Sequence, residues 1–224
     1  MSGRFITFEG GEGSGKTTQL KGLLAHLRSL GRDAIETRDP GGTAIGNQMR
    51  GLLLDGENAL MVPIAELLLY EASRAQLVRE VIRPALAADR IVLCDRFTDS
   101  TVAYQGYGRG LDLGLIDRLN DLATDGLRPH LTLLLDLDPA VGLARARERL
   151  THPSAHRDRL EGEHLEFHQQ VRNGYRTIAT QDPERVVVLD AMHGILEIEA
   201  QIRRRIEPLL AAGNGSAGSP PENG

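Results

Sequence analysis

Short apolar runs alternate with longer amphipathic segments along most of the 224-residue chain. Five runs have the length and composition of short buried strands. They are Phe5–Phe8, Ala34–Thr37, Ile91–Cys94, Leu131–Leu135 and Val186–Leu189.

The segments between these runs show helical periodicity. Leu20, Leu23, Leu24 and Leu27 share one face of a first predicted helix. A longer helix, predicted to end before the Ala88-Asp89 turn, is marked by Ile64, Leu68, Ala75, Val78, Ile82 and Leu86. A further helix is marked by Phe167, Val171, Tyr175 and Ile178. Strands that alternate with helices predict an α/β fold in which helices cover both faces of a parallel sheet.

A glycine-rich stretch, Gly10–Thr17, follows the first predicted strand and opens the first predicted helix. It fits the P-loop pattern G-x-x-x-x-G-K-[ST], whose backbone amides and helix N-terminus bind phosphate. The pattern places Lys16 on the outer phosphates and the Thr17 hydroxyl on Mg²⁺. No G-x-G-x-x-G can be laid over these glycines, which argues against a dinucleotide fold. The predicted nucleotide-binding residues are Gly10, Gly11, Glu12, Gly13, Ser14, Gly15, Lys16, Thr17 and Thr18.

Composition and charge narrow the class of protein. The length suits a single domain, predicted over residues 1–210, and residues 211–224 have the composition of a disordered tail. A net charge of −5 argues against a general nucleic-acid binder. No apolar run is long enough to span a membrane, no secretory signal is evident, and a lone cysteine, Cys94, fits a reducing compartment. We therefore expect a cytoplasmic protein without membrane or nucleic-acid partners.

Charged residues follow the predicted strands directly, at Glu9, Arg38-Asp39, Asp95-Arg96, Asp136 and Asp190. In open α/β sheets, ligands bind beyond the carboxyl ends of the strands. An apolar run that ends in Asp95, beside a P-loop, resembles a Walker B motif, so Thr17 and Asp95 are the predicted metal ligands. Asp136 and Asp190 need no role beyond ending their strands.

Five arginines lie between Arg145 and Arg159, and Thr151-His152-Pro153-Ser154 interrupts them. Two interpretations stay open. The segment, about 145–160, is either a mobile lid that brings arginines over a phosphoryl donor or the solvated end of a charge-rich helix.

Several motifs, in their order and spacing, resemble bacterial thymidylate kinase over residues 3–210. They are Phe8-Glu9-Gly10 leading into the P-loop, Thr37-Arg38-Asp39-Pro40-Gly41-Gly42-Thr43, Ser73-Arg74-Ala75-Gln76, Asp95-Arg96 followed by Ser100-Thr101-Val102-Ala103-Tyr104-Gln105-Gly106, and Gly142-Leu143-Ala144-Arg145-Ala146-Arg147. The resemblance implies a P-loop kinase fold with a five-stranded parallel sheet and a homodimer. It also implies transfer of the γ-phosphate of ATP to dTMP, with Mg²⁺, in dTTP biosynthesis.

The resemblance also implies roles for individual residues. Arg38 and Arg96 would clamp the 5′-phosphate of dTMP, Glu12 would accept from its 3′-hydroxyl, and Arg74 would donate to a thymine carbonyl. Tyr70 stands where the family usually has a phenylalanine stacked on the base. Thr101 would be a second base contact, Tyr104 would exclude a ribose 2′-hydroxyl and Gln105 would be a nearby polar support. The implied dTMP-binding set is Glu12, Arg38, Tyr70, Arg74, Arg96, Ser100, Thr101, Tyr104 and Gln105.

On the donor side, Arg145 would pack on adenine. Arg149 would be the lid arginine, because the P-loop carries no basic residue between Gly10 and Lys16. The implied catalytic set is Lys16, Asp95, Arg96 and Arg149. The acceptor phosphate is already anionic at neutral pH, so no general base is expected.

Three other functions remain open from the sequence. They are a P-loop kinase for another nucleotide or deoxynucleoside, a regulatory or motor-type nucleotide hydrolase, and an inactive P-loop scaffold. The chain has no N-K-x-D guanine-reading motif, which argues against the regulatory class.

Overall fold

The computed structural model describes residues 3–149 and 159–211. Its strands form one sheet in the order β2-β3-β1-β4-β5, and every adjacent pair is parallel. The strands are β1 Arg4–Glu9, β2 Ala34–Arg38, β3 Ile91–Asp95, β4 Leu131–Asp136 and β5 Val186–Asp190. The predicted α/β fold with a five-stranded parallel sheet is therefore confirmed.

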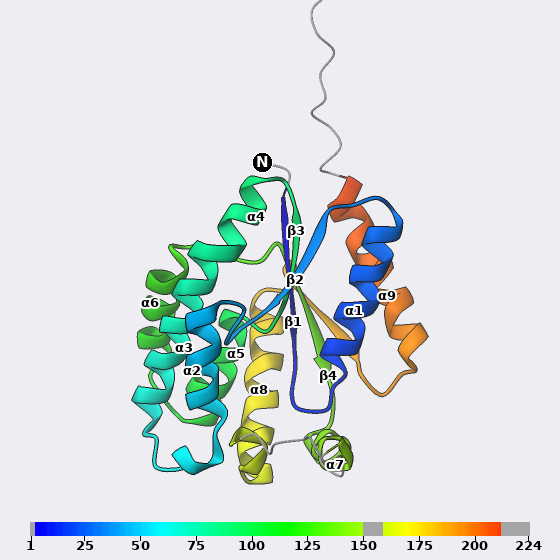
Figure 1. The fold of residues 1–224 in the computed structure, drawn as a ribbon. Coiled ribbons are helices and arrows are strands. Elements are labelled where there is room, and N and C mark those ends of the chain that lie inside the picture. Colours follow the sequence, from blue (N-terminus) through cyan, green and yellow to red (C-terminus); the bar gives the residue numbers. More distant parts are fainter. Residues whose placement is uncertain (1–2, 150–158, 212–224) are drawn as a thin grey trace, which may run out of the picture.

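Helices connect the strands and cover both faces of the sheet (Figure 1). They are α1 Lys16–Ser29, α2 Ala44–Leu54, α3 Pro63–Leu77, α4 Arg83–Ala87, α5 Thr98–Thr101, α6 Leu113–Thr124, α7 Pro139–Arg149, α8 Leu165–Gln181 and α9 Ile195–Ala211. Shorter 3-10 turns span Gly56–Asn58 and Leu160–Gly162, and π-helical turns span Val78–Ile82 and Val102–Gly108.

The core consists of apolar layers on either side of the sheet. On one face, α1 and α9 pack together against the strands (Figure 1). The four leucines predicted to share a face of α1 are all buried there, so this prediction is confirmed. On the other face, α3, α4, α6 and α8 cover the strands, and Phe167, Val171, Tyr175 and Ile178 are buried as predicted.

The predicted apolar face of the longer helix is buried at Val78 and Ile82 but was predicted wrongly at the start of the helix. The helix that includes α3 and α4 does end before Ala88, but Ile64 and Leu68 are 43% and 51% exposed. The buried face of α3 carries Leu67 and Leu77 together with the charged residues Glu66, Glu71 and Arg74. Periodicity of apolar residues selects the wrong face here, because this helix buries charged side chains in ion pairs.

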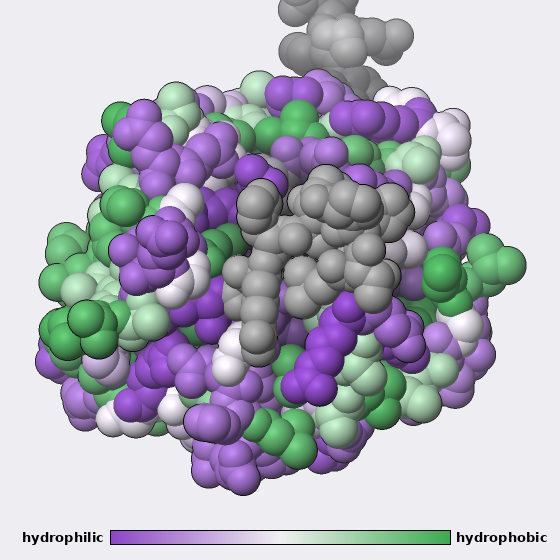
Figure 2. Space-filling model, turned by 60° about the horizontal axis from the view of Figure 1, so that its bottom comes forward, coloured by the Kyte–Doolittle hydropathy of each residue, from purple (hydrophilic) through white to green (hydrophobic). Residues whose placement is uncertain are grey.

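Strand order determines where the functional groups meet. In the register of β1 with β3, Phe8 lies beside Asp95, so the two chain segments that follow these strands leave the sheet side by side. The carboxyl edge of the sheet is the face turned toward the viewer in Figure 2, where hydrophilic side chains are frequent. This edge is where the sequence predicted a ligand site.

Two predicted features lie wholly or largely outside the described residues. Helix α7 extends through Arg149 and the chain is described again from Arg159, so most of the predicted lid lies outside the described part. Helix α9 reaches Ala211, one residue into the predicted tail, and the remainder of that tail is also outside it. Among the described helices, none is long and apolar enough to cross a bilayer.

Candidate active site

The P-loop connects β1 to α1 and lies against the carboxyl ends of β3 and β4. Lys16, the first residue of α1, is 8% exposed, and its Nζ donates to the carbonyl oxygens of Gly10 at 3.1 Å and Gly11 at 2.9 Å. Burial lowers the pKa of Lys16 to about 8, with nearby Arg96 acting in the same direction against Glu12. The Lys16 ammonium group is thus held at the loop, and its lowered pKa brings its titration close to neutral pH.

The lowered pKa of Lys16 predicts a pH-dependent affinity for a nucleoside triphosphate. A bound phosphate raises the pKa of Lys16, so affinity is at its full value below about pH 8 and falls as pH rises through that value. We expect a loss of up to roughly tenfold per pH unit above it. Titration calorimetry with ATP between pH 6.5 and 9.5 measures this slope. Lys16→Met should bind more weakly and show no such slope; an equal slope in that variant would contradict the assignment.

A close approach between backbones holds the P-loop against α7. Gly13 has a φ of 67°, and a Cβ placed on it would overlap the carbonyl oxygen of Gly142. A Cβ on Gly142 would in turn overlap the carbonyl oxygen of Glu12. Only glycine at both positions permits this contact, which sets the position of the loop relative to the first turns of α7.

Gly142→Ala is therefore expected to destabilise the protein. Inside a helix, glycine to alanine normally stabilises by about 0.5–1 kcal/mol. Here the new methyl group meets rigid backbone, and overpacking of this kind costs about 1–3 kcal/mol. Gly51→Ala is the matched control, since Gly51 lies within α2 and a Cβ there meets nothing within 4 Å. Thermal unfolding should show a lower Tm for Gly142→Ala and a higher one for Gly51→Ala; a rise in both would contradict the steric argument.

The two predicted metal ligands lie together. The Thr17 hydroxyl donates to Asp95 Oδ2 at 2.9 Å. Within the described part of the chain no cluster of three or more His, Cys, Asp or Glu side chains could hold a metal. A hydroxyl and a carboxylate beside a phosphate-binding loop are a donor set that fits Mg²⁺, which takes oxygen ligands and retains waters and substrate phosphates.

Arg96 directly follows β3, and its guanidinium group forms several hydrogen bonds within the site. It has a φ of 71°, which is unusual for a residue with a side chain. Its Nη2 donates to Glu12 Oε1 at 2.6 Å and to the Tyr104 hydroxyl at 3.0 Å. Its Nη1 donates to the Gly10 carbonyl at 3.1 Å, so the guanidinium directly contacts the P-loop.

Glu12 is the acidic partner of Arg96 in this arrangement. Burial raises the pKa of Glu12, but Arg96 and Lys16 outweigh burial and bring it to about 2. The Tyr104 hydroxyl also donates to Glu12, at 2.9 Å. Glu12 is therefore an ionised P-loop residue that accepts hydrogen bonds from Arg96 and Tyr104.

A cleft of about 860 Å³ runs from the P-loop across the ends of β2 and β3. It contains most of the residues predicted for both substrates. They are Glu12, Gly13, Ser14, Gly15, Lys16, Thr17, Thr18, Arg38, Tyr70, Arg74, Asp95, Arg96, Ser100, Thr101, Tyr104 and Gln105. Arg38 is exposed in it and donates to Asn47 Oδ1 at 3.3 Å.

Arg74 has a different environment from the one the resemblance implies. It is 1% exposed, and its Nε donates to Asp39 at 2.6 Å. Its Nη1 donates to Glu71 and Asn120, and its Nη2 to the Phe97 carbonyl and Thr101. All five guanidinium N–H groups thus have protein acceptors, and a contact with a base would require one of them to be exchanged.

One residue that contacts Arg96, Tyr175, was not among the site residues predicted from the sequence. Tyr175 was predicted only as a core residue of α8, yet its hydroxyl lies 3.0 Å from Arg96 Nη1 and donates to Glu9 Oε2 at 2.8 Å. Burial raises the pKa of Glu9 to about 7, and Asp99 acts in the same direction. Periodicity identifies the face on which Tyr175 lies but not the partner of its hydroxyl.

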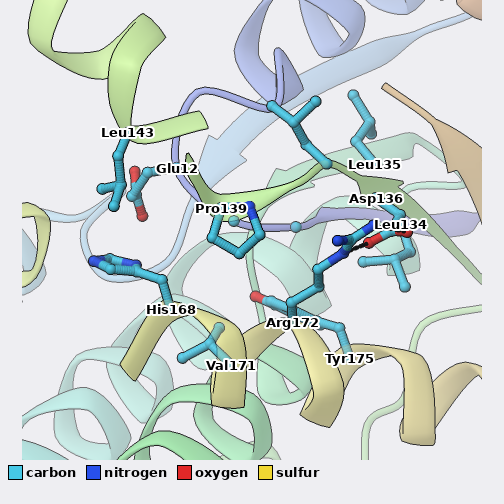
Figure 3. A pocket seen from close by; sticks show the side chains of 13 residues that line it. Glu12, Leu134, Leu135, Asp136, Pro139, Leu143, His168, Val171, Arg172 and Tyr175 are labelled. Atoms are coloured by element: carbon cyan, nitrogen blue, oxygen red, sulfur yellow. Dashed lines mark hydrogen bonds and ion pairs between the residues drawn. The ribbon is translucent and has the colours of Figure 1, made fainter. Parts of the chain in front are cut away.

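A second, smaller cavity lies between the P-loop, α7 and α8 (Figure 3). Its free volume of about 20 Å³ has room for one water. Arg172 reaches from α8 to Asp136 at 2.7 Å and 3.0 Å, which ties the end of β4 to that helix. Asp136 therefore has a structural ion-pair partner, in keeping with its prediction as a strand-ending residue.

The arginines after Gly142 occupy different environments. Arg145 donates to the Ala191 carbonyl at 3.3 Å, beyond the end of β5, and Arg147 is exposed. Arg149 is the last residue of α7, and the position of its side chain lies outside the described structure. Arg159 is 7% exposed in an ion pair with Glu66 on α3.

Similarity to known proteins agrees with this geometry. A family model described as thymidylate kinase matches residues 8–202. The thymidylate kinase of Geotalea uraniireducens (strain Rf4) is 54% identical over 212 residues, which cover 94% of this chain and 100% of that protein. That of Synechococcus sp. (strain JA-2-3B'a(2-13)) is 55% identical over 92% of this chain and 95% of that protein. The crystal structure of thymidylate kinase from Ehrlichia chaffeensis superposes with a TM-score of 0.73 at 36% identity, covering 92% of this chain and 98% of that one. The chain belongs to the thymidylate kinase family.

Proposed function

We propose that the protein transfers the γ-phosphoryl group of ATP to the 5′-phosphate of dTMP, giving dTDP and ADP for dTTP biosynthesis in the cytoplasm. Family membership supports this reaction. The observation that carries it is a single cleft that contains both the P-loop and, at the ends of β2 and β3, the two arginines Arg38 and Arg96. A hydrolase or motor would need only the first of these two features.

The reaction brings two polyanions together, so positioning and charge neutralisation supply most of the rate. The P-loop amides and Lys16 would hold the ATP phosphates, while Arg38 and Arg96 would hold the phosphate of dTMP with bidentate hydrogen bonds. Thr17 and Asp95 would hold Mg²⁺, which when bound neutralises phosphate charge. The acceptor phosphate is ionised at neutral pH, so no side chain needs to remove a proton.

The nucleoside parts of both substrates would extend from these phosphates. Tyr70, Thr101, Tyr104 and Gln105 line the cleft beyond Arg96 and would surround the thymine and its deoxyribose. Arg145, next to the turn that follows β5, would pack on adenine. Arg149, at the end of α7, remains our proposed lid arginine.

We also propose a homodimer, as the family resemblance implies. Four exposed aliphatic side chains on α2 and α3 support it: Ile45, Leu52, Ile64 and Leu68. Apolar side chains are also frequent at the left edge of Figure 2, the side on which α2 and α3 lie in Figure 1. Sedimentation equilibrium measures the state of association.

A coupled ADP-release assay with dTMP, dUMP, dCMP and GMP tests the proposed function. We expect dTMP to give the highest kcat/KM. Release without an acceptor at the full rate would indicate a hydrolase, whereas ATP binding without release would indicate a scaffold. Preference for another monophosphate would indicate a different nucleotide kinase.

A further inference from the structure

Glu66 is a buried carboxylate on α3 that the proposed reaction does not use. It is 0% exposed and accepts hydrogen bonds from three side chains, two of them at Gln105 and Arg109 in one segment and the third at Arg159. Gln105 Nε2 donates to Oε1 at 2.7 Å, and Arg109 donates to both oxygens at 3.2 Å. Arg159, just before the 3-10 turn at Leu160–Gly162, forms an ion pair with Oε2.

This set of donors keeps Glu66 ionised. Burial raises its pKa, but the hydrogen bonds from Arg109 and Gln105 outweigh burial and lower it below its ordinary value. An ionised carboxylate only accepts hydrogen bonds. Gln105 must therefore turn its NH₂ group toward Glu66, and the orientation of its amide is determined.

The opposite end of the Gln105 amide is its carbonyl oxygen. Gln105 is 1% exposed and lines the large cleft with Tyr70, Thr101 and Tyr104. Among the residues that the structure describes, only Glu66 forms a side-chain hydrogen bond with the Gln105 amide. The carbonyl oxygen of Gln105 thus has no side-chain partner among the described residues and is a free acceptor at the cleft wall, to which a ligand donor could bind.

We propose that Glu66 is a positioning residue that orients Gln105 Oε1 as a hydrogen-bond acceptor for the base of the acceptor nucleotide. Thymine and uracil carry a donor at N3, whereas cytosine carries an acceptor there. The carbonyl oxygen of Gln105 would accept a hydrogen bond from N3 of thymine or uracil. With cytosine it would face N3, a second acceptor, and no hydrogen bond would form. The inference rests on the proposed function, because it takes the cleft as a pyrimidine monophosphate site.

The surroundings of Glu66 suit this role. Arg159 is fixed through its backbone N–H to the Leu54 carbonyl and its Nε to the Leu53 carbonyl, both at 3.0 Å. Arg109 lies over the Phe167 ring at 4.7 Å and pairs with Glu163 at 2.7 Å. Arg74 cannot substitute for Gln105, because it donates only and its donors are already engaged.

Glu66→Gln tests the inference. A neutral amide at position 66 can face Gln105 with either its oxygen or its NH₂, so the orientation of Gln105 is no longer determined. Competition binding gives Kd values for dTMP, dUMP and dCMP, and steady-state kinetics gives KM for ATP. The wild type should prefer dTMP and dUMP to dCMP by at least roughly tenfold, the effect of one mismatched buried hydrogen bond. Glu66→Gln should lose most of this ratio while KM for ATP stays unchanged.

Glu163→Gln is the matched control. It neutralises an acid that also pairs with Arg109 but does not contact Gln105, so the dTMP-to-dCMP ratio should keep its wild-type value. If Glu66→Gln does not fold, Gln105→Met is the second test. It removes the amide and should by itself abolish the preference for dTMP over dCMP.

A wild-type ratio in Gln105→Met, or in folded Glu66→Gln, overturns the inference. If both variants phosphorylate dTMP with the wild-type ratio, the proposed function stands and only the role of Glu66 and Gln105 fails. If the wild type does not phosphorylate dTMP, the proposed function fails and the inference fails with it.

Discussion

Arg96→Ala is expected to lower kcat/KM for dTMP by about 10³-fold or more, with little change in the Kd for ATP. Arg96 is the cation placed between the P-loop and the acceptor side of the cleft, where its contacts include Glu12 and Tyr104. Removing one preorganised donor from such a site typically costs 10²–10³-fold, and a clamp on the substrate phosphate adds ground-state binding. Alanine and arginine both carry a Cβ, so the positive φ at this position is equally strained in both.

Arg90→Ala is the control for this measurement. Arg90 lies just before β3, at the opposite end of the strand from Arg96, and pairs with exposed Asp33 at 2.9 Å. Its loss should leave kcat/KM unchanged. Steady-state kinetics with dTMP and calorimetry with ATP separate the two substrates. Full dTMP turnover by Arg96→Ala would remove Arg96 from the acceptor site.

Arg74→Met is expected to destabilise the protein by about 3–5 kcal/mol, the cost of breaking a buried ion pair by removing one partner. Arg74 neutralises two buried carboxylates, Asp39 and Glu71, and burial raises the pKa of each of them. Without the guanidinium, both must be protonated or remain buried without a cation. For a chain of this size, the loss corresponds to a fall in Tm of roughly 6–20 °C.

Arg79→Met provides the comparison for Arg74→Met. Arg79 is exposed in the π-helical turn that continues α3, so the same substitution there should change stability by less than about 0.5 kcal/mol. Thermal and urea unfolding of both variants measure the difference. If Arg74→Met keeps the wild-type Tm and raises only KM for dTMP, Arg74 acts mainly as a direct contact to the base.

The framework of the fold could be predicted because it depends on local patterns. Apolar runs such as Ile91–Cys94 are short and bounded, and the P-loop has a fixed order of glycines before Lys16. The carboxyl ends of parallel strands share one edge, so Asp95 and Arg96 were expected near Thr17, and Asp95 is bonded to it.

The charged interior could not be predicted in the same way. A buried Glu66 or Arg74 has the same local sequence signal as a surface residue, because its partners are distant in the chain: Gln105 and Arg109 for Glu66, and Asn120 for Arg74. Ile64 and Leu68 were consequently placed on the wrong side of α3. The partners of the Tyr175 hydroxyl are likewise hidden, because an aromatic ring at helical spacing indicates core whether or not its hydroxyl is used.

The account depends most on a second anion site, formed by Arg38 and Arg96, opposite the P-loop. Comparing the Kd of dTMP with that of thymidine, in the wild type and in Arg38→Ala, tests it directly, because Arg38 is exposed and its loss disturbs no buried pair. We predict that Arg38→Ala weakens dTMP binding by roughly 10- to 100-fold, since a hydrogen bond to a charged group contributes about 1.5–3 kcal/mol, and leaves thymidine binding unchanged. An unchanged preference for dTMP over thymidine in this variant would contradict the account.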